Sequence, residues 1–170
     1  KYYYDLITAT YDPPLGAGGV IENVSSNPDF EFSGNIINRV VTRGVLATTR
    51  GKIRIENNRF LNTGMSGILI SDDAREWFES GCVNDVVIRG NAFMNCEDDA
   101  ILIKPESHKY NGPVHRNILI ESNLFVLNET HAVNVSCSSD VVLRGNTYAG
   151  NPRNNKYIVA DKVENLVTDK

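Results

Sequence analysis

Short apolar segments with period-two alternation recur along the chain, and a turn phrase that contains asparagine follows each of them. The segments are residues 30–32, 53–55, 86–88, 118–120 and 141–143. The asparagines are Asn35, Asn58, Asn91, Asn123 and Asn146, spaced by 23, 33, 32 and 23 residues. A repeat of this length predicts a solenoid, a propeller or another stacked array.

The segments predict strands rather than helices. They are rich in Val, Ile and Phe and break at Gly-Asn or Asn-Asn, and no Leu-x-x-Leu-x-Leu framework recurs. The pattern therefore predicts an all-β fold, a right-handed parallel β-helix of about five to six coils with two inserted loops. Each coil is expected to hold three short strands, and coils should stack about 4.8 Å apart.

The repeated residues have structural roles in this fold. Each asparagine is expected to tolerate left-handed backbone angles and to bond its equivalents in the coils above and below, which forms an asparagine ladder. The residues two positions later should form an apolar stack, and they are Ile37, Phe60, Phe93, Phe125 and Tyr148. A further strand recurs at residues 44–46, 67–70, 100–103 and 132–135.

Length and composition indicate one domain, residues 1–170, with 41% hydrophobic residues. We predict a lead-in segment at 1–28, coils at 29–167 and loop insertions at 71–84 and 104–116. The chain lacks an initiator Met and an evident cap, which predicts a piece of a longer chain and end-to-end self-association at an exposed coil end. Residues 157–160 and 163–167 suggest one more partial coil.

The net charge of the chain and the spacing of its Cys and His residues argue against nucleic-acid, membrane and metal partners. A net charge of −4 without a Lys/Arg run argues against nucleic acid, and no apolar run reaches membrane length. Three cysteines without paired spacing predict free thiols, at Cys82, Cys137 and an inward-facing Cys96. The histidines His108, His115 and His131 are scattered, which predicts surface or turn positions and no metal site.

The two insertions follow the same strand of successive coils, so they should emerge side by side. The first concentrates four carboxylates and the only Trp within nine positions. Carboxylates that grip hydroxyl groups, beside an aromatic ring that stacks on a pyranose, are typical of a sugar site. The candidate substrate-binding residues are Asp72, Asp73, Trp77, Glu79 and Glu106. The same first segment also fits a capped short helix whose aromatic residues anchor it to the coil.

Asp98-Asp99-Ala100 opens the strand one coil after Asp73. Carboxylates on adjacent coils can lie about 5 to 10 Å apart, the range used by glycosidases. Asp73 and Asp99 are therefore reserve catalytic candidates. However, Asp99 precedes its strand whereas Asp73 follows its own, so both also fit solvated turn positions.

A resemblance covers roughly residues 15–150. It is carried by residues 20–23, 43–60, 67–74, 77–81, 83–93 and 113–117. These segments resemble the α-1,3-galactosidases of glycoside hydrolase family 110, and the run from Asp73-Ala74 through Trp77 to Glu79-Ser80-Gly81 is the most distinctive. The resemblance implies a bacterial, periplasmic or extracellular exo-enzyme that removes terminal α-1,3-linked galactose with inversion and without a cofactor.

The family's catalytic carboxylates belong to Asp-Ala-x-His and Asp-Asp-Ala-x-Asn-x-His segments. This chain contains neither in full, because Asp98-Asp99-Ala100 continues through Leu102 to Lys104 without a His. The resemblance thus implies that this chain supplies cleft walls and that the catalytic carboxylates lie upstream. A different class of function is a non-catalytic carbohydrate-binding or structural β-helix segment of a surface protein. Polysaccharide lyases share the fold but favour basic and calcium-binding residues, whereas the acidic, aromatic insertion suits a neutral sugar.

Overall fold

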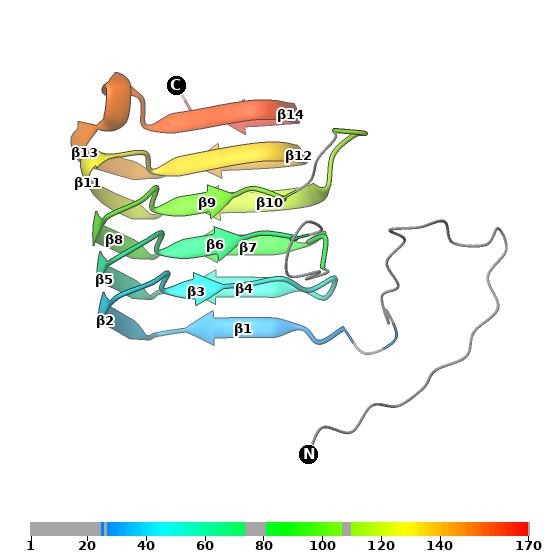
Figure 1. Ribbon diagram of the computed structural model, residues 1–170, viewed down its shortest axis with the longest axis horizontal. Coiled ribbons are helices and arrows are strands. Elements are labelled where there is room, and N and C mark those ends of the chain that lie inside the picture. Colours follow the sequence, from blue (N-terminus) through cyan, green and yellow to red (C-terminus); the bar gives the residue numbers. More distant parts are fainter. Residues whose placement is uncertain (1–24, 26, 74–80, 107–109, 170) are drawn as a thin grey trace, which may run out of the picture.

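The structure is a computed structural model that describes residues 25, 27–73, 81–106 and 110–169. They form stacked coils in which every strand pair is parallel (Figure 1). The all-β parallel helix predicted from the repeat is therefore confirmed.

Each coil contributes a strand to three faces. The first face holds β1 (Phe30–Ser33), β4 (Ile53–Glu56), β7 (Val86–Arg89), β10 (His115–Glu121) and the second half of β12 (Val133–Arg144). The second holds β2 (Ile36–Val40), β5 (Arg59–Thr63), β8 (Ala92–Cys96), β11 (Leu124–Thr130) and β13 (Thr147–Pro152). The third holds β3 (Val45–Leu46), β6 (Ile68–Ile70), β9 (Ile101–Ile103) and the first half of β12.

The strand β14 (Ile158–Thr168) follows a short 3-10 turn, η2 (Arg153–Asn155), and pairs along most of β12. It forms the additional partial coil expected at residues 157–167. Because β12 runs without interruption from the third face to the first, it joins both faces into one nine-stranded sheet. The second face is a separate five-stranded sheet.

The predicted aromatic stack runs through the core. The rings of Phe60, Phe93 and Phe125 lie 5.0 Å apart from centroid to centroid and within 6° of parallel, and Tyr148 continues the stack at 5.5 Å. Ile37 packs against the core as a partly buried neighbour. Each fully buried apolar side chain contributes about 1.5–3 kcal/mol of transfer free energy, so this column is a principal source of stability.

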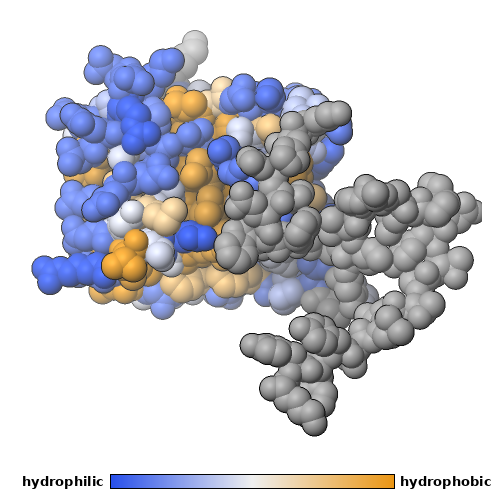
Figure 2. All heavy atoms as spheres, viewed as in Figure 1, coloured by the Kyte–Doolittle hydropathy of each residue, from blue (hydrophilic) through white to orange (hydrophobic). Residues whose placement is uncertain are grey.

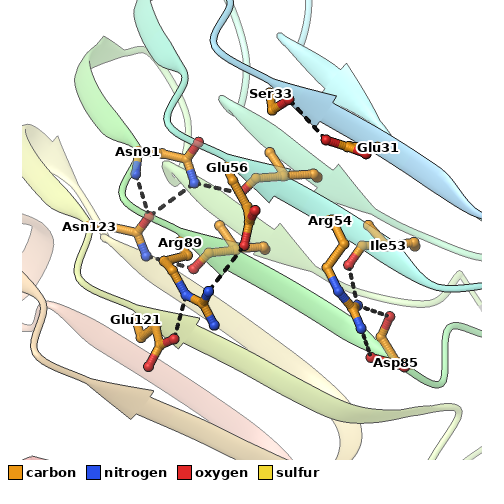
Figure 3. Close-up of polar contacts among 12 residues, drawn as sticks. Glu31, Ser33, Ile53, Arg54, Glu56, Asp85, Arg89, Asn91, Glu121 and Asn123 are labelled. Atoms are coloured by element: carbon orange, nitrogen blue, oxygen red, sulfur yellow. Dashed lines mark hydrogen bonds and ion pairs between the residues drawn. The ribbon is translucent and has the colours of Figure 1, made fainter.

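The asparagine ladder is also confirmed (Figure 3). The side-chain amide of Asn91 donates to the side-chain oxygen of Asn123 at 3.0 Å and to the carbonyl oxygen of Ile55 at 2.8 Å. Asn35, Asn58 and Asn123 repeat the lateral bond at 3.0 to 3.2 Å. The ladder thereby satisfies buried polar groups that would each cost about 1–3 kcal/mol if left unpaired.

The left-handed backbone conformation predicted for each ladder asparagine occurs instead at the residue before it. Positive φ occurs at the residue that precedes each ladder asparagine, and these residues are Gly34, Asn57, Gly90, Ser122 and Gly145. The ladder asparagines do not appear among the described residues with positive φ. A left-handed residue at this point turns the chain, and the following asparagine is then directed along the stack.

Charged residues form an alternating ladder on the outside of the first face (Figure 3). Arg89 lies 3.4 Å from Glu56 and 2.5 Å from Glu121, measured between guanidinium nitrogen and carboxylate oxygen. Arg144 reaches the other oxygen of Glu121 at 2.7 Å. These pairs hold unlike charges in register on neighbouring strands, and each is worth at most about 1 kcal/mol because the arginines are exposed.

Two histidines are buried; His131 lies in the turn between β11 and β12, as predicted, whereas the prediction of a surface or turn position is wrong for His115. His115 begins β10, is 0% exposed, and accepts a hydrogen bond at Nδ1 from the backbone N–H of Val83 at 3.3 Å. Burial lowers the pKa of His115 to about 4, because the apolar surroundings disfavour the charged ring. His131 is 7% exposed, and His108 lies outside the described residues. Cys96 is buried, as predicted.

Candidate functional site

The two insertions leave the same corner of the solenoid and remain paired as they leave. The backbone N–H of Lys104 donates to the carbonyl of Ile70 at 2.9 Å, and that of Glu106 donates to the carbonyl of Asp72 at 2.8 Å. A parallel bridge between Asp73 and Glu106 continues the pairing. The described parts of the insertions therefore emerge side by side, as predicted. The second one ends at residue 114, since β10 begins at His115.

The outgoing arms, residues 71–73 and 104–106, form a wall with two sides, because successive side chains of an extended segment point in opposite directions. On one side lies a groove of about 510 Å³, which we call the outer groove. Its lining consists of Arg43, Leu46, Met65, Leu69, Ser71, Asp73, Leu102, Lys104 and Glu106. On the other side lies a cavity of about 680 Å³, the fork cavity. It is lined by Arg50, Asp72, Cys82, Val83, Asn84, Pro105, Pro113, Val114 and Arg116.

The floor of the outer groove is a strip of leucines. Leu46 pairs in register with Leu69, and Leu69 pairs with Leu102, so their side chains follow one another on the third face. Figure 2 shows this apolar surface over β3, β6 and β9, with hydrophilic residues on both sides. This strip was not predicted from the sequence, although the alternation of β6 and β9 places Leu69 and Leu102 opposite the inward isoleucines.

Two carboxylates stand at one end of the strip. Asp73 and Glu106 are bridge partners that line the same groove, so their side chains start about 4.8 Å apart on neighbouring coils. The ammonium group of Lys104 lies 3.2 Å from Glu106 Oε1. The structure therefore brings together two of the predicted substrate-binding residues, and it adds a lysine and Arg43 as possible hydrogen-bond donors at this groove.

Asp72 faces the fork cavity instead. The thiol of Cys82 donates to Asp72 Oδ2 at 3.3 Å. Burial, together with the Asp72 carboxylate, raises the pKa of the Cys82 thiol, so the thiol stays protonated and keeps its role as donor. Asp72 and Asp73 were predicted to act in one site, but they line different spaces because they are consecutive residues of an extended arm.

Asp99 precedes β9, whereas the insertion residues Lys104 and Glu106 follow that strand. It is 2% exposed and accepts hydrogen bonds from the backbone N–H of His131 at 2.9 Å and from the side chain of Asn134 at 2.7 Å. Nδ1 of His131 lies 2.8 Å from the same carboxylate. These contacts stabilise the corner before β9. The prediction that Asp99 is a solvated turn residue is therefore wrong.

The reserve pair is not brought together. Asp73 stands opposite Glu106, which follows Asp99 by seven residues along a continuous parallel ladder. At about 3.3 Å per residue, Asp73 and Asp99 are about 20 Å apart, well beyond the 5 to 10 Å that a glycosidase pair requires. Parallel stacking places equivalent positions of successive coils next to one another. Asp99 precedes β9 whereas Asp73 follows β6, so the two residues do not occupy equivalent positions.

Trp77 and Glu79 lie outside the described residues, as does the short helix considered for this segment. Among the residues that the structure does describe, no three His, Cys, Asp or Glu side chains are grouped so that they could hold a metal ion. Within the same part of the chain, no helix has the length and apolar character needed to span a membrane.

Comparison with known proteins agrees with this architecture. Residues 18–169 match the family model described as a right handed beta helix region. Alpha-1,3-galactosidase A of Bacteroides thetaiotaomicron is 44% identical over 129 residues, which is 75% of this chain and 23% of the relative. Alpha-1,3-galactosidase A of Streptomyces avermitilis is 38% identical over 148 residues, which is 83% of this chain and 24% of the relative. Alpha-1,3-galactosidase B of B. thetaiotaomicron is 41% identical over 151 residues, which is 78% of this chain and 24% of the relative.

The chain thus spans about a quarter of the length of these curated relatives. Identities of about 40% over 129 to 151 residues confirm the resemblance that the sequence segments predicted. The family match also confirms the right-handed form of the helix.

Proposed function

This chain belongs to the family of right-handed β-helices, and from that premise we propose that it is part of a bacterial exo-acting glycoside hydrolase that removes terminal α-1,3-linked galactose with inversion. The observation that carries the proposal is homology to α-1,3-galactosidases over three quarters or more of this chain. The partner is then an oligosaccharide with terminal galactose, and a periplasmic or extracellular location follows from such a substrate.

The outer groove supports a role in holding the sugar. Leu46, Leu69 and Leu102 offer an apolar floor for the C–H face of a pyranose ring, as hydrophobic linings commonly do in ligand sites. Asp73 and Glu106 stand where they can accept hydrogen bonds from its hydroxyl groups. We assign both to substrate binding, together with Trp77 and Glu79, which adjoin Asp73 in sequence.

The catalytic carboxylates are proposed to lie upstream of this chain. An inverting enzyme needs a carboxylic acid and a carboxylate about 6.5–9.5 Å apart, with space for a water molecule between the base and the sugar. Asp73 and Asp99 are too widely separated, and Glu106 is engaged by Lys104. The residues described therefore suit the walls of a cleft better than its reacting pair.

Galactose release from an α-1,3-linked galactosyl disaccharide tests the proposal, measured with this chain and with a polypeptide extended upstream by several coils. We expect turnover in the extended polypeptide alone. In that polypeptide, Asp73→Asn and Glu106→Gln should each raise KM by about tenfold with little change in kcat, because they remove substrate-binding contacts. The matched control is Glu31→Gln on the first face, where the carboxylate contacts Ser33 and lies outside the groove.

A carbohydrate-binding or structural segment is the second candidate, favoured by the separation of Asp73 from Asp99 and by the ion pair between Glu106 and Lys104. Binding of the disaccharide without turnover in either polypeptide would select it. Turnover by this chain alone would instead place the reacting carboxylates within these 170 residues.

A further inference from the structure

We propose that Asn111, on the returning part of the second insertion, is a site of spontaneous deamidation, at which its side-chain amide is converted into aspartate and isoaspartate. The reaction needs water alone, and it adds one negative charge to a chain whose formal net charge is −4. The inference goes beyond the proposed function and does not depend on it, because Asn111 lines neither the outer groove nor the fork cavity.

Asn111 is followed by Gly112, and this is the only Asn-Gly pair among the 170 residues. Deamidation begins when the backbone nitrogen of the following residue attacks the side-chain carbonyl carbon of the asparagine. Glycine lacks the Cβ that would crowd this approach. Every other asparagine of the chain precedes a residue with a side chain, so the sequence distinguishes Asn111 from all of them.

The side-chain amide of Asn111 also differs from the amides that stack between coils. In the inner ladder Asn91 donates to Asn123 at 3.0 Å, and in an outer row Asn95 donates to Asn62 at 3.1 Å. Such bonds fix the side-chain torsions, so the carbonyl carbon cannot turn towards the next backbone nitrogen without breaking them. Asn111 is exposed, and within the described part of the chain its side chain makes no hydrogen bond. Its amide is therefore able to rotate into the reactive position.

The backbone at Gly112 leaves room for the reaction. Gly112 has φ of 121°, a conformation that residues with side chains rarely adopt. A Cβ built on Gly112 would meet no heavy atom of the described residues within 4 Å, other than those of its two chain neighbours. The N–H of Gly112 makes no backbone hydrogen bond with any residue that the structure describes. The attacking nitrogen is therefore neither covered nor engaged.

Contacts on both sides attach this segment to the stack without including the Asn-Gly pair. The Tyr110 hydroxyl donates to Glu164 Oε1 at 3.4 Å, and the backbone N–H of Val114 donates to the carbonyl of Cys137 at 2.7 Å. A carboxylate formed at residue 111 follows directly after Tyr110. Isoaspartate also inserts a methylene group into the main chain between the two attachments, so the modification changes both the charge and the length of the returning segment.

The reaction balances with water as the only reagent. The Gly112 nitrogen loses its proton to hydroxide or water and attacks Cγ of Asn111, which closes a succinimide ring, while the side-chain nitrogen takes up a proton and leaves as ammonia. Water then opens the ring. Cleavage between the ring nitrogen and Cγ gives aspartate, and cleavage between the ring nitrogen and the main-chain carbonyl carbon gives isoaspartate. Because the attacking nitrogen must lose a proton, the rate rises with pH.

Incubation of the full chain at neutral and at mildly alkaline pH, followed by proteolysis and mass spectrometry, tests the inference. The peptide that contains residue 111 should gain the mass of an amide-to-acid exchange and separate into aspartate and isoaspartate forms, faster at the higher pH. Asn38 and Asn128 are the internal controls, because both are exposed but precede Arg39 and Glu129. Their peptides should keep their amides over the same period.

Two variants examine the two reacting groups. Gly112→Ala should slow the reaction by about tenfold, because a Cβ crowds the approach to the nitrogen. Asn111→Gln should abolish it over the same period, because the longer side chain has to close a larger, less favourable ring. Circular dichroism and the unfolding midpoint establish that each variant is folded, and Asn111→Gln leaves the backbone of Gly112 as it is.

The same chain unfolded in urea is the reference for the role of the fold. The folded chain should deamidate at residue 111 within about tenfold of the unfolded rate, because this exposed bend needs no global unfolding to react. Stronger protection in the folded chain would overturn the inference. So would an Asn111 amide that lasts as long as those of Asn38 and Asn128, or an undiminished mass gain in Asn111→Gln. None of these measurements uses a sugar, so the inference and the proposed function can fail separately.

Discussion

The corner between the third and first faces is built in two ways within one stack. After β6 and β9 the chain leaves the coil in long insertions, whereas β12 turns the same corner as a continuous strand of 12 residues. In β12, Cys137 adopts φ of 49° and the Ser138 hydroxyl donates to the carbonyl of Ser136 at 2.8 Å. A few small residues are therefore sufficient to turn this corner, and the solenoid itself does not require the insertions.

The inserted corner has the features that the direct corner lacks. It carries the paired carboxylates Asp73 and Glu106 and adjoins both ligand-sized spaces, while the direct corner keeps Ser138 and Ser139 buried and pairs with β14. In the direct corner a serine side chain bonds the local backbone, whereas in the inserted corners Asp73 and Glu106 line a groove. The stack therefore provides stability and the insertions provide the candidate site, and four experiments test this division.

The strongest test converts one inserted corner into a direct one, by replacing residues 104–114 with the dipeptide Ser136-Cys137, which separates the β12 partners of Ile103 and His115. Binding of the galactosyl disaccharide to the outer groove should be lost, because Lys104 and Glu106 of this insertion line it. The free energy of unfolding should change by only about 1 kcal/mol, since shortening a loop recovers little closure entropy. Calorimetric binding and urea unfolding give both quantities. Unfolding of the chain would show that the insertion supports the stack.

The second test weakens the stack instead. Phe93→Ala removes a ring held between two parallel neighbours and should cost about 4 kcal/mol of unfolding free energy. The folded fraction should still bind ligand normally, because Phe93 contributes to neither space. Urea unfolding and binding at low temperature measure the two effects. Phe30→Ala, at the partly buried end of the stack, is the control and should cost less.

The third test uses pH at the base of the inserted corner. The pKa of His115 is lowered to about 4 in the folded chain from about 6.5, so the unfolded chain binds more protons between these values. Stability is therefore present above pH 6.5 and falls as the pH drops toward 4, by up to about 3 kcal/mol. His115→Ser copies its direct-corner partner Ser138 and should remove this part of the acid sensitivity. Unfolding midpoints from pH 7.5 to 4 measure the difference between variant and parent.

The smallest effect concerns the corner before β9. Asp99→Asn places an amide where two donors, from His131 and Asn134, now meet a carboxylate, and should cost about 2 kcal/mol. It should leave KM for the galactosyl disaccharide unchanged in the extended polypeptide, whereas Asp73→Asn raises it. Paired unfolding and kinetic measurements distinguish the two. A specific loss of kcat in a stably folded Asp99→Asn variant would contradict the structural role.

The parts of the fold that repeat were predictable. Phe60, Phe93 and Phe125, and the ladder from Asn35 to Asn146, recur at one position of every unit, so their stacking follows from the period. The site was only partly predictable. Asp73 and Glu106 were selected as insertion residues, but their pairing depends on the register between β6 and β9.

The period, the strand composition and the two lengthened units follow from the sequence, because a repeat must place equivalent side chains above one another. Which carboxylates meet depends on how the coils stack. Stacking in register brings Asp73 to Glu106 and separates it from Asp99, while extended geometry turns Asp72 into another space. Spacing along the chain records the number of residues in each coil. It does not show from which corner of the coil a side chain projects, and that position determines which functional groups lie together.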